Sequence, residues 1–279
     1  MKVCVIGNGG REHALAWRLS ISPSVTKVYA IPGSAAMSDC AELVGIDWQQ
    51  SDHLIRFLKD NHVDLVVVGP EAPLVAGLAD ALNAAGIPVF GPSKAAAQLE
   101  GSKVFAKDLM KKYNIPTAAY GVFHKVDEAK EFIAQTGAPI VVKADGLAAG
   151  KGVVVAMTTE EANAAVEDML SGNRFGEAGS TVVIEEFMEG EEASLLAFVD
   201  GKTVVPMIAS QDHKRIFDGD NGPNTGGMGT YAPAPVLTDA LWDEAMKTIL
   251  EPMVAAMQKE GMPYVGCLYA GLMITPQGP

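Results

Sequence analysis

Short apolar segments alternate with longer amphipathic segments along the first ninety residues. Four apolar, β-branched runs are predicted to be strands: 2–6, 27–31, 65–68 and 89–90. Three segments with helical spacing of apolar residues lie between them: 12–20, 51–61 and 74–85. Strands that are connected through helices pair in parallel, so this part of the chain is predicted to form a parallel α/β sheet.

The segment 51–61 shows the helical pattern in detail. Leu54, Ile55 and Leu58 recur on one face, as expected when one stripe of a helix packs on a sheet. Ser51 stands at the start of this pattern and is predicted to be the N-cap of the helix.

The pattern changes after residue 92. A helix is predicted over 102–113, followed by a small α+β lobe. In this lobe four segments are predicted to be strands: 120–123, 140–143, 152–156 and 181–185. Two segments are predicted to be helices: 127–135 and 160–170.

The last third of the chain combines strands, a glycine-rich stretch and one helix. Asp200 and Gly201 separate apolar runs at 192–199 and 203–209 and predict a hairpin with a type I′ turn. Four further features follow: a glycine-rich loop without regular structure over 212–230, a helix over 239–259, a strand over 266–275, and Pro276–Pro279. A strand with no return strand leaves a sheet edge open, so we expect the natural protein to continue.

Composition narrows the function classes. Hydrophobic residues make up 48% of the 279 residues, which supports a sizeable core. The net charge of −13, without a basic run, argues against nucleic-acid binding. Three cysteines without paired spacing indicate a reducing compartment, and no stretch is long and apolar enough to span a membrane. We therefore expect a cytoplasmic protein that binds neither nucleic acid nor membranes.

The first candidate site is the loop 7–13, which follows a strand and opens a helix. Free N–H groups and the helix dipole there could bind an anion, and Arg11 adds a cation. The sixth position of a dinucleotide fingerprint is Glu12 rather than glycine, so that motif is absent. A tight turn with an exposed arginine is the alternative. Loops at 32–37 and 69–74 also follow parallel strands, where ligands of such sheets bind.

The second candidate is the glycine-rich segment 143–153, which lies between two strands. A P-loop is excluded by spacing and by the absence of a following helix. The segment could close over a triphosphate with Lys143 as a fixed charge, or it could be a flexible, solvated hairpin.

Two further segments carry dense charge. The connector within 182–194 contains five carboxylates, which suits either a solvated face or a cation partner. The stretch 212–229 combines Lys214 and Arg215 with small residues and could cradle phosphate and carboxylate groups. Asp218 and Asp220 lack EF-hand spacing, and the five histidines form no metal pattern. No nucleophile motif is present.

Eight motifs in unbroken order give these segments a common interpretation. They are GNGGREHA, GPEAPL, LEGSK, KADGLAAGKGVVVA, IEEFMEGEEAS, SQDHKR, GPNTGGMG and LYAGLM. Together they closely resemble the phosphoribosylamine-glycine ligase family, whose members are also called glycinamide ribonucleotide synthetases. The resemblance runs from residue 1 to residue 279 and is far more specific than any single glycine loop.

The resemblance implies the fold and the domain limits. A Rossmann-like parallel sheet at 1–100, the pre-ATP-grasp domain, would precede an incomplete ATP-grasp fold at 101–279. Within the latter, residues 123–187 would form a small lobe that bears the lid, and residues 101–122 and 188–279 a large lobe.

The resemblance also implies an activity and the residues that serve it. ATP, glycine and 5-phosphoribosylamine would give glycinamide ribonucleotide, ADP and phosphate through a glycyl phosphate, in purine biosynthesis. Lys143, Lys214 and Arg215 would be catalytic. The ATP site would comprise Lys103, Lys143, the lid residues Ala149, Gly150, Lys151 and Gly152, the hinge residues Glu185, Glu186, Phe187 and Met188, and Glu192 at the ribose, with Glu191 possible in its place. The substrate site would comprise Gly9, Gly10, Arg11, Glu12, Pro70, Glu71, Asp212, Lys214, Arg215, Gly226, Gly227, Met228 and Gly229.

One departure concerns the metal. The family's Mg²⁺ or Mn²⁺ ligands lie beyond the segment that corresponds to residue 279, so no metal ligand is assigned here and this chain is expected to be inactive alone. A monomer is expected. Another ATP-grasp ligase is an alternative, although it should lack DHKR and GPNTGGMG. A nucleotide-binding regulatory or interaction module without catalysis is the alternative from a different class.

Overall fold

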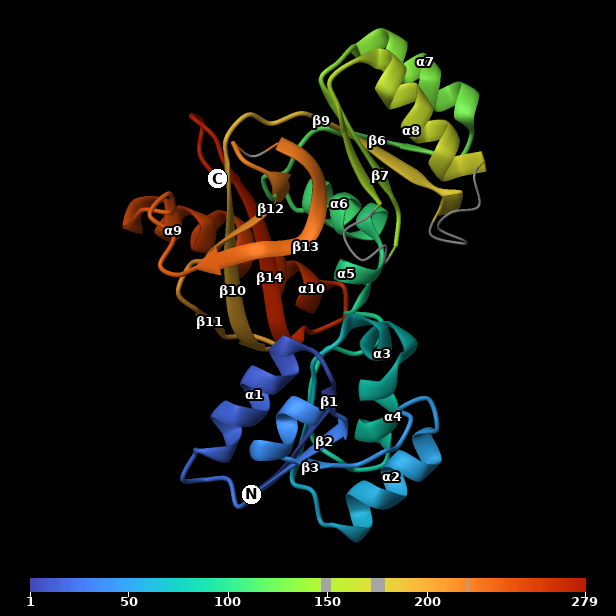
Figure 1. The fold of residues 1–279 in the computed structure, drawn as a ribbon. Coiled ribbons are helices and arrows are strands. Elements are labelled where there is room, and N and C mark those ends of the chain that lie inside the picture. The colour runs from blue at the N-terminus through green and yellow to red at the C-terminus, as the bar shows by residue number, and fades with distance from the viewer. Residues whose placement is uncertain (147–151, 172–178, 220) are drawn as a thin grey trace. The chain divides into compact units, whose positions relative to one another are not determined.

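The computed structural model describes residues 1–146, 152–171, 179–219 and 221–279 (Figure 1). The chain forms two compact units. Unit 1 consists of Met1–Gln98 and Gly261–Gly266, and unit 2 consists of Leu99–Glu260 and Cys267–Pro279. The limits 1–100 and 101–279 stay a prediction, because unit 1 also takes a segment from late in the chain.

Unit 1 is built on a five-stranded sheet in which every pair of neighbouring strands is parallel. Its strands in sheet order are β3 (Glu42–Leu43), β2 (Lys27–Pro32), β1 (Lys2–Gly7), β4 (Leu65–Val68) and β5 (Val89–Phe90). The strand order reverses between β1 and β4, and the loops that follow these two strands meet where ligands bind in such sheets. The predicted parallel α/β architecture is confirmed.

Helices cover both faces of this sheet. The helical segments of unit 1 are α1 (Gly10–Ser20), the 3₁₀ helix η1 (Ala35–Asp39), α2 (Ser51–Asp60), α3 (Glu71–Ala76) and α4 (Leu78–Ala84). Alternate strand residues point to opposite faces. Cys4 and Ile6 therefore join the core under α2, α3 and α4, whereas Val5 packs with Ala16 of α1.

Two local predictions in unit 1 were wrong in detail. The segment expected as one helix over 74–85 is divided into α3 and α4, because Gly77 adopts the left-handed conformation with φ of 97°. Helix α2 has Gln50 rather than Ser51 as its N-cap, and no side chain caps it. The amphipathic pattern therefore located the helices but not their ends.

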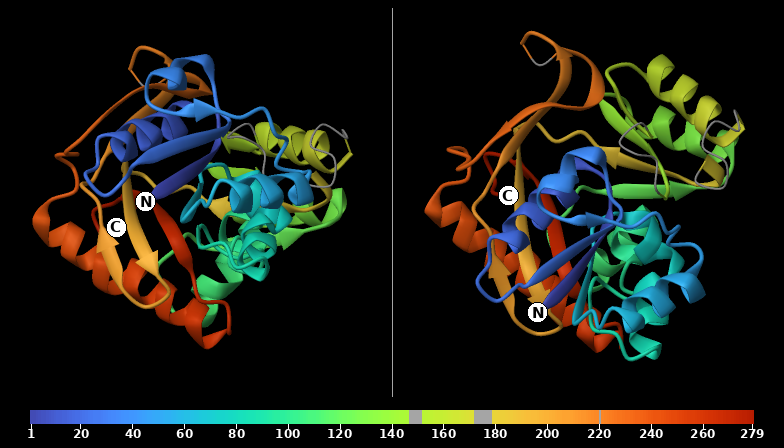
Figure 2. Two further views of the ribbon diagram at one scale, coloured as in Figure 1. Left: turned by 90° about the horizontal axis from the view of Figure 1, so that it is seen from below. Right: turned by 60° about the horizontal axis from the view of Figure 1, so that its bottom comes forward.

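The small lobe of unit 2 contains a four-stranded antiparallel sheet. Its strands in sheet order are β6 (Tyr120–Phe123), β9 (Val182–Glu186), β7 (Ile140–Ala144) and β8 (Val153–Ala156). Helices α7 (Val126–Thr136) and α8 (Thr159–Ser171) lie side by side and share an apolar core with the sheet (Figures 1 and 2). The predicted α+β lobe is confirmed.

The larger part of unit 2 contains a three-stranded sheet, in the order β11 (Val204–Pro206), β10 (Glu191–Asp200) and β14 (Val265–Ile274). The predicted helix over 239–259 forms as three joined segments: α9 (Asp239–Ala245), a π-helical turn η3 (Met246–Leu250) and α10 (Glu251–Lys259). The hairpin of β10 and β11 is confirmed, but the type I′ turn is not. Gly201 has a positive φ and Asp200 does not; instead, the Asp200 carboxylate accepts the N–H groups of Lys202 and Thr203.

The glycine-rich stretch 212–230 is the largest departure from the sequence analysis. It is not an irregular loop but a two-stranded antiparallel ribbon of β12 (Gln211–Phe217) and β13 (Asn221–Tyr231). Glycines at the tip and within β13 adopt positive φ angles, which lets the ribbon turn and bulge. A pattern dominated by glycine carries no alternation of apolar and polar residues, so strand pairing was not visible in the sequence.

Helices α5 (Gln98–Gly101) and α6 (Lys103–Lys112) open unit 2. Ser102 caps α6, since its hydroxyl accepts the Phe105 N–H at 3.1 Å and donates to the Asp145 carboxylate at 3.1 Å. We expect Ser102→Ala to lower the free energy of unfolding by about 1 kcal/mol through loss of this cap. Urea denaturation measures the change. Ser51→Ala is the matched control because Ser51 caps no helix; an equal loss there would contradict the prediction.

Candidate active site

A cluster of lysines and one buried carboxylate joins the two lobes of unit 2. Lys143, on β7, donates from Nζ to Oε2 of Glu185 on β9 at 2.7 Å. Lys107, on α6, contacts the same oxygen at 3.2 Å. The Glu185 side chain is only 5% exposed, and the two lysines are the counter-ions that a buried carboxylate needs.

A second carboxylate, Asp145, holds the start of α6 beside this cluster. Its Oδ1 accepts the Val104 N–H at 3.1 Å, and Nζ of Lys103 donates to the Gly146 carbonyl at 3.0 Å. Burial lowers the pKa of Lys103, while the nearby Asp145 charge acts in the opposite direction. The sequence prediction brought Lys103 and Lys143 to one site; the structure adds Asp145 and Lys107, which it missed.

A cavity of about 530 Å³ in unit 2 lies next to the cluster. Lys107, Lys143 and Glu185 line its charged side, and Leu99, Met110 and Met188 contribute apolar surface. A volume of this size, apolar with a few converging charges, is typical of a small-molecule site.

The four residues 185–188 differ in what they do. Glu185 faces the lysines, and Glu186 accepts the Ala119 N–H at 2.8 Å through its side chain. Phe187 is exposed, and Met188 lines the cavity. The assignment of all four to a base-binding hinge stays a prediction.

Most of the predicted lid lies outside the described residues. Ala149, Gly150 and Lys151 are among the residues outside, so their closure over a nucleotide stays a prediction. Gly152 is described: it is buried, and its carbonyl accepts the Ala144 N–H at 2.8 Å.

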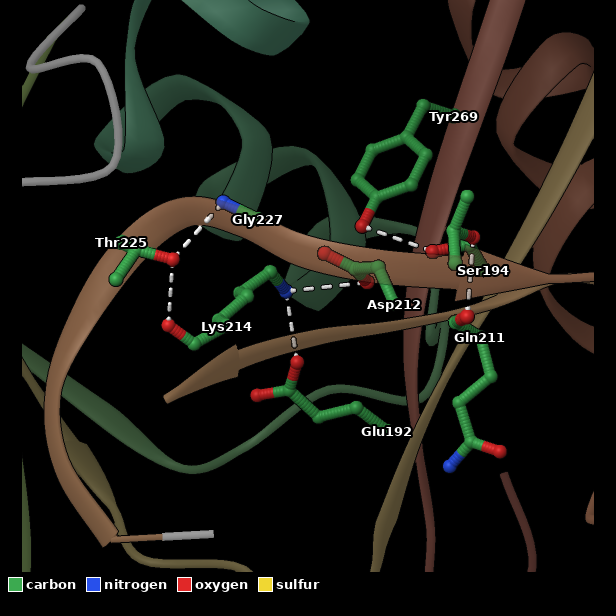
Figure 3. A network of polar contacts seen from close by, with 9 residues as sticks. Glu192, Ser194, Gln211, Asp212, Lys214, Thr225, Gly227 and Tyr269 are labelled. Atoms are coloured by element: carbon green, nitrogen blue, oxygen red, sulfur yellow. Dashed lines mark hydrogen bonds and ion pairs between the residues drawn. The ribbon is translucent and has the colours of Figure 1, made fainter. Parts of the chain in front are cut away.

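The ribbon and β10 are tied together by Lys214. Its Nζ contacts Glu192 at 2.7 Å and Asp212 at 3.6 Å, and Figure 3 shows the ammonium between these two carboxylates. Burial lowers the pKa of Lys214, but the hydrogen bond that Lys214 donates to Glu192 outweighs this effect, and the pKa is raised overall. The predicted ribose carboxylate and a predicted catalytic lysine are therefore direct partners, whereas Glu191 contacts Gln211 at 3.5 Å.

Opposite Lys214, the strand β13 bulges. His213 pairs with Gly229 and Arg215 pairs with Asn224. The segment 225–228 of β13 therefore lies opposite the single residue Lys214 of β12, which is a bulge. Thr225 holds the bulge, because its hydroxyl donates to the Lys214 carbonyl at 2.9 Å and accepts the Gly227 N–H at 3.0 Å (Figure 3). Gly226, Gly227, Met228 and Gly229 are exposed at this bulge. Arg215 donates to the Gly222 carbonyl at 2.7 Å.

In unit 1, Arg11 bridges the loops that follow β1 and β4. Its guanidinium donates to Glu12 at 2.7 Å and to Glu71, which follows Pro70, at 2.8 Å. Burial lowers the pKa of Arg11, yet the hydrogen bonds to Glu71 and Glu12 outweigh this and raise it overall. Both loops lie at the reversal of strand order, and both follow parallel strands, as the sequence predicted.

Glu12 is less available than the sequence suggested. It is 3% exposed, and its Oε2 accepts the Gly9 N–H at 2.8 Å. Glu12 thus holds the shape of the loop from within, next to Gly7 and Gly69. Gly9 and Gly10 are exposed, and Glu71 is half-buried. Contacts of these residues and of Glu12 with a substrate stay a prediction.

Among the described residues, no group of three or more His, Cys, Asp or Glu side chains is placed to hold a metal ion. Within the same ranges, every helix is too short or too polar to cross a membrane.

The lysine cluster, the antiparallel lobe with two covering helices and the preceding parallel sheet define an ATP-grasp protein with its N-terminal domain. Two family profiles match in succession: "Phosphoribosylglycinamide synthetase, N domain" over residues 1–100 and "Phosphoribosylglycinamide synthetase, ATP-grasp (A) domain" over residues 101–279. The chain belongs to the phosphoribosylglycinamide synthetase family.

Individual relatives agree with this assignment. The phosphoribosylamine–glycine ligases of Agrobacterium fabrum and Halalkalibacterium halodurans are 57% and 56% identical over 279 residues. The chain is covered completely but spans only 66% and 65% of their length, slightly less than two thirds. The crystal structure of the Thermotoga maritima phosphoribosylamine–glycine ligase is 34% identical in sequence, and it superposes on this chain with a TM-score of 0.85. The match covers 100% of this chain and 67% of that one.

Proposed function

We propose that the protein to which this chain contributes ligates glycine to 5-phosphoribosylamine at the expense of ATP, in purine biosynthesis. The observation that carries the proposal is the family match over all 279 residues, with relatives named for this reaction. In the proposed reaction the glycine carboxylate attacks the γ-phosphate of ATP and releases ADP. The amine of phosphoribosylamine then attacks the glycyl phosphate, and phosphate leaves.

The proposed nucleotide site is the cavity of unit 2. Lys103 and Lys143 would contact ATP phosphates, since Lys143 lines the cavity and Lys103 is a partly buried cation whose charge interacts with that of Lys143. Residues 185–188 would meet adenine, and Glu192 the ribose. This assignment is supported by the lining of the cavity, which combines the cations Lys107 and Lys143 with apolar side chains.

Two groups of residues are proposed for the substrates: the loops at 9–12 and 70–71 in unit 1, and Asp212, Lys214, Arg215 and the glycine bulge at 226–229 in unit 2. Arg11 suits the phosphate of phosphoribosylamine, because a guanidinium presents paired donors to such a group. Lys214 and Arg215 would neutralise charge on the transferring phosphoryl group or on glycine. Backbone N–H groups of the bulge would supply further donors.

A divalent ion would neutralise phosphate charge during phosphoryl transfer, as it does in related chemistry. The described residues do not provide a fitting donor set, and no step is assigned to a metal here. We propose that the 279 residues alone bind ATP weakly and do not turn over.

The test measures ADP release that depends on both glycine and phosphoribosylamine. A full-length protein that contains this chain should show it, and the purified 279 residues should bind ATP without turnover even with saturating Mg²⁺. ATP binding without dependence on either substrate in the full-length protein would favour a nucleotide-binding module that lacks catalysis. Substrate-dependent turnover by the 279 residues alone would show that the metal site has been misplaced.

A further inference from the structure

Lys107 is a buried cation beside the proposed nucleotide site to which the proposed function gives no role. Its side chain is 10% exposed. Nζ donates to Thr117 Oγ1 at 2.8 Å and to the Ala118 carbonyl at 3.4 Å, and it contacts Glu185 Oε2 at 3.2 Å. Three acceptors match the three N–H groups of an ammonium, so the geometry indicates the charged form.

Lys143 is held much less firmly. It shares Oε2 of Glu185 with Lys107, at 2.7 Å, but within the described ranges Glu185 is the partner that the structure gives it. Its side chain is 26% exposed and lines the cavity. One carboxylate thus pairs with two lysines, of which Lys107 has three acceptors and Lys143 lines the cavity.

This difference matters when a phosphate group enters the cavity. A phosphate there would compete with Glu185 for the Lys143 ammonium and would draw it away from the carboxylate. A buried carboxylate that loses its only counter-ion is strongly destabilised, so a Glu185 paired with Lys143 alone would oppose that movement. Because Lys107 contacts the same oxygen, Glu185 keeps a counter-ion when Lys143 leaves.

We propose that Lys107 is the permanent counter-ion of Glu185 and thereby a positioning residue, which frees Lys143 to bind nucleotide phosphates. The inference rests on the proposed function, since it assumes that the cavity takes ATP. Lys107 lies one helical turn after Lys103, so α6 supplies both the lysine proposed for phosphate and the lysine that keeps Glu185 paired.

The test separates phosphate binding from binding of the base and sugar. The affinities of the 279-residue chain for ATP and for adenosine are measured by titration, and their ratio gives the contribution of the phosphates. Lys107→Met should lower this ratio about tenfold, because Lys143 is then retained by Glu185. Removing the carboxylate as well, in Lys107→Met with Glu185→Gln, should restore the ratio. Lys111→Met, an exposed position on the same helix, should leave it unchanged.

Each outcome decides the question. An unchanged ratio in Lys107→Met, or no restoration in the double variant, overturns the role of Lys107. A wild-type chain that binds ATP no better than adenosine overturns the proposed function and this inference with it. If Lys143→Met lowers the ratio and Lys107→Met does not, only this inference fails. If Lys107→Met does not fold, Glu185→Gln is compared with the double variant. Neither has the carboxylate that Lys107 pairs with, so the proposal requires the same ratio of ATP to adenosine affinity in both.

Discussion

Lys143→Met is expected to weaken ATP binding about 10- to 150-fold. The substitution keeps the aliphatic stem and removes the charge that lines the cavity beside Glu185. A charge-assisted contact to phosphate contributes roughly 1.5 to 3 kcal/mol, and each 1.36 kcal/mol corresponds to a factor of ten. Adenosine lacks the phosphates, so its affinity should change little.

Isothermal titration with ATP and with adenosine measures the effect. Lys125→Met provides the control, because Lys125 is an exposed lysine of the same lobe that pairs with Glu128. ATP affinity equal to that of the wild type would remove Lys143 from the phosphate site. An equal loss for adenosine would instead indicate that the substitution disturbs the cavity as a whole.

Gly69→Ala is expected to lower the free energy of unfolding by roughly 2 to 4 kcal/mol. A Cβ at this position would lie 2.2 Å from Oε1 and 2.5 Å from Cγ of Glu12. The Glu12 side chain is buried and fills the space between the loops after β1 and β4, so it must move. Its hydrogen bonds to the Gly9 N–H and to Arg11 would then be lost.

Urea denaturation followed by tryptophan fluorescence reports on this change, since Trp17 and Trp48 lie in unit 1. Gly10→Ala is the matched control, because a Cβ at Gly10 meets nothing within 4 Å. Glu12→Ala should also destabilise the protein, and the double variant should lose less than the sum of the two single losses. Additive losses would show that Gly69 and Glu12 are not in conflict through this contact.

The sequence predicted most of unit 1 and of the small lobe because their apolar periodicity is strong. It also placed Lys103 and Lys143 together through the resemblance. It did not reveal β3, whose two residues are too few to show alternation. The ribbon of β12 and β13 was missed for another reason: its glycines pair through backbone geometry, which apolar spacing does not encode.

Roles that depend on burial were also beyond the sequence. The resemblance implies that Glu12 belongs to the substrate site, and only the structure shows that its side chain is enclosed among glycines. The spacing of four residues places Lys103 and Lys107 on one helix face, which is the signal that could have drawn attention to Lys107. It could not show that Lys107 reaches Glu185, because that contact joins segments 78 residues apart on different elements.

The segment Gly261–Gly266 belongs to unit 1, although the rest of that unit ends at Gln98. There Gly266 lies so close to Pro92 that a Cβ would come within 2.9 Å of the proline ring. During translation, a domain can close only after all of its parts have left the ribosome. The first unit of this protein therefore cannot reach its final packing until most of the second has been synthesised, and a shortened message that encodes residues 1–98 would leave Gly91 and Pro92 without their contact with Gly266.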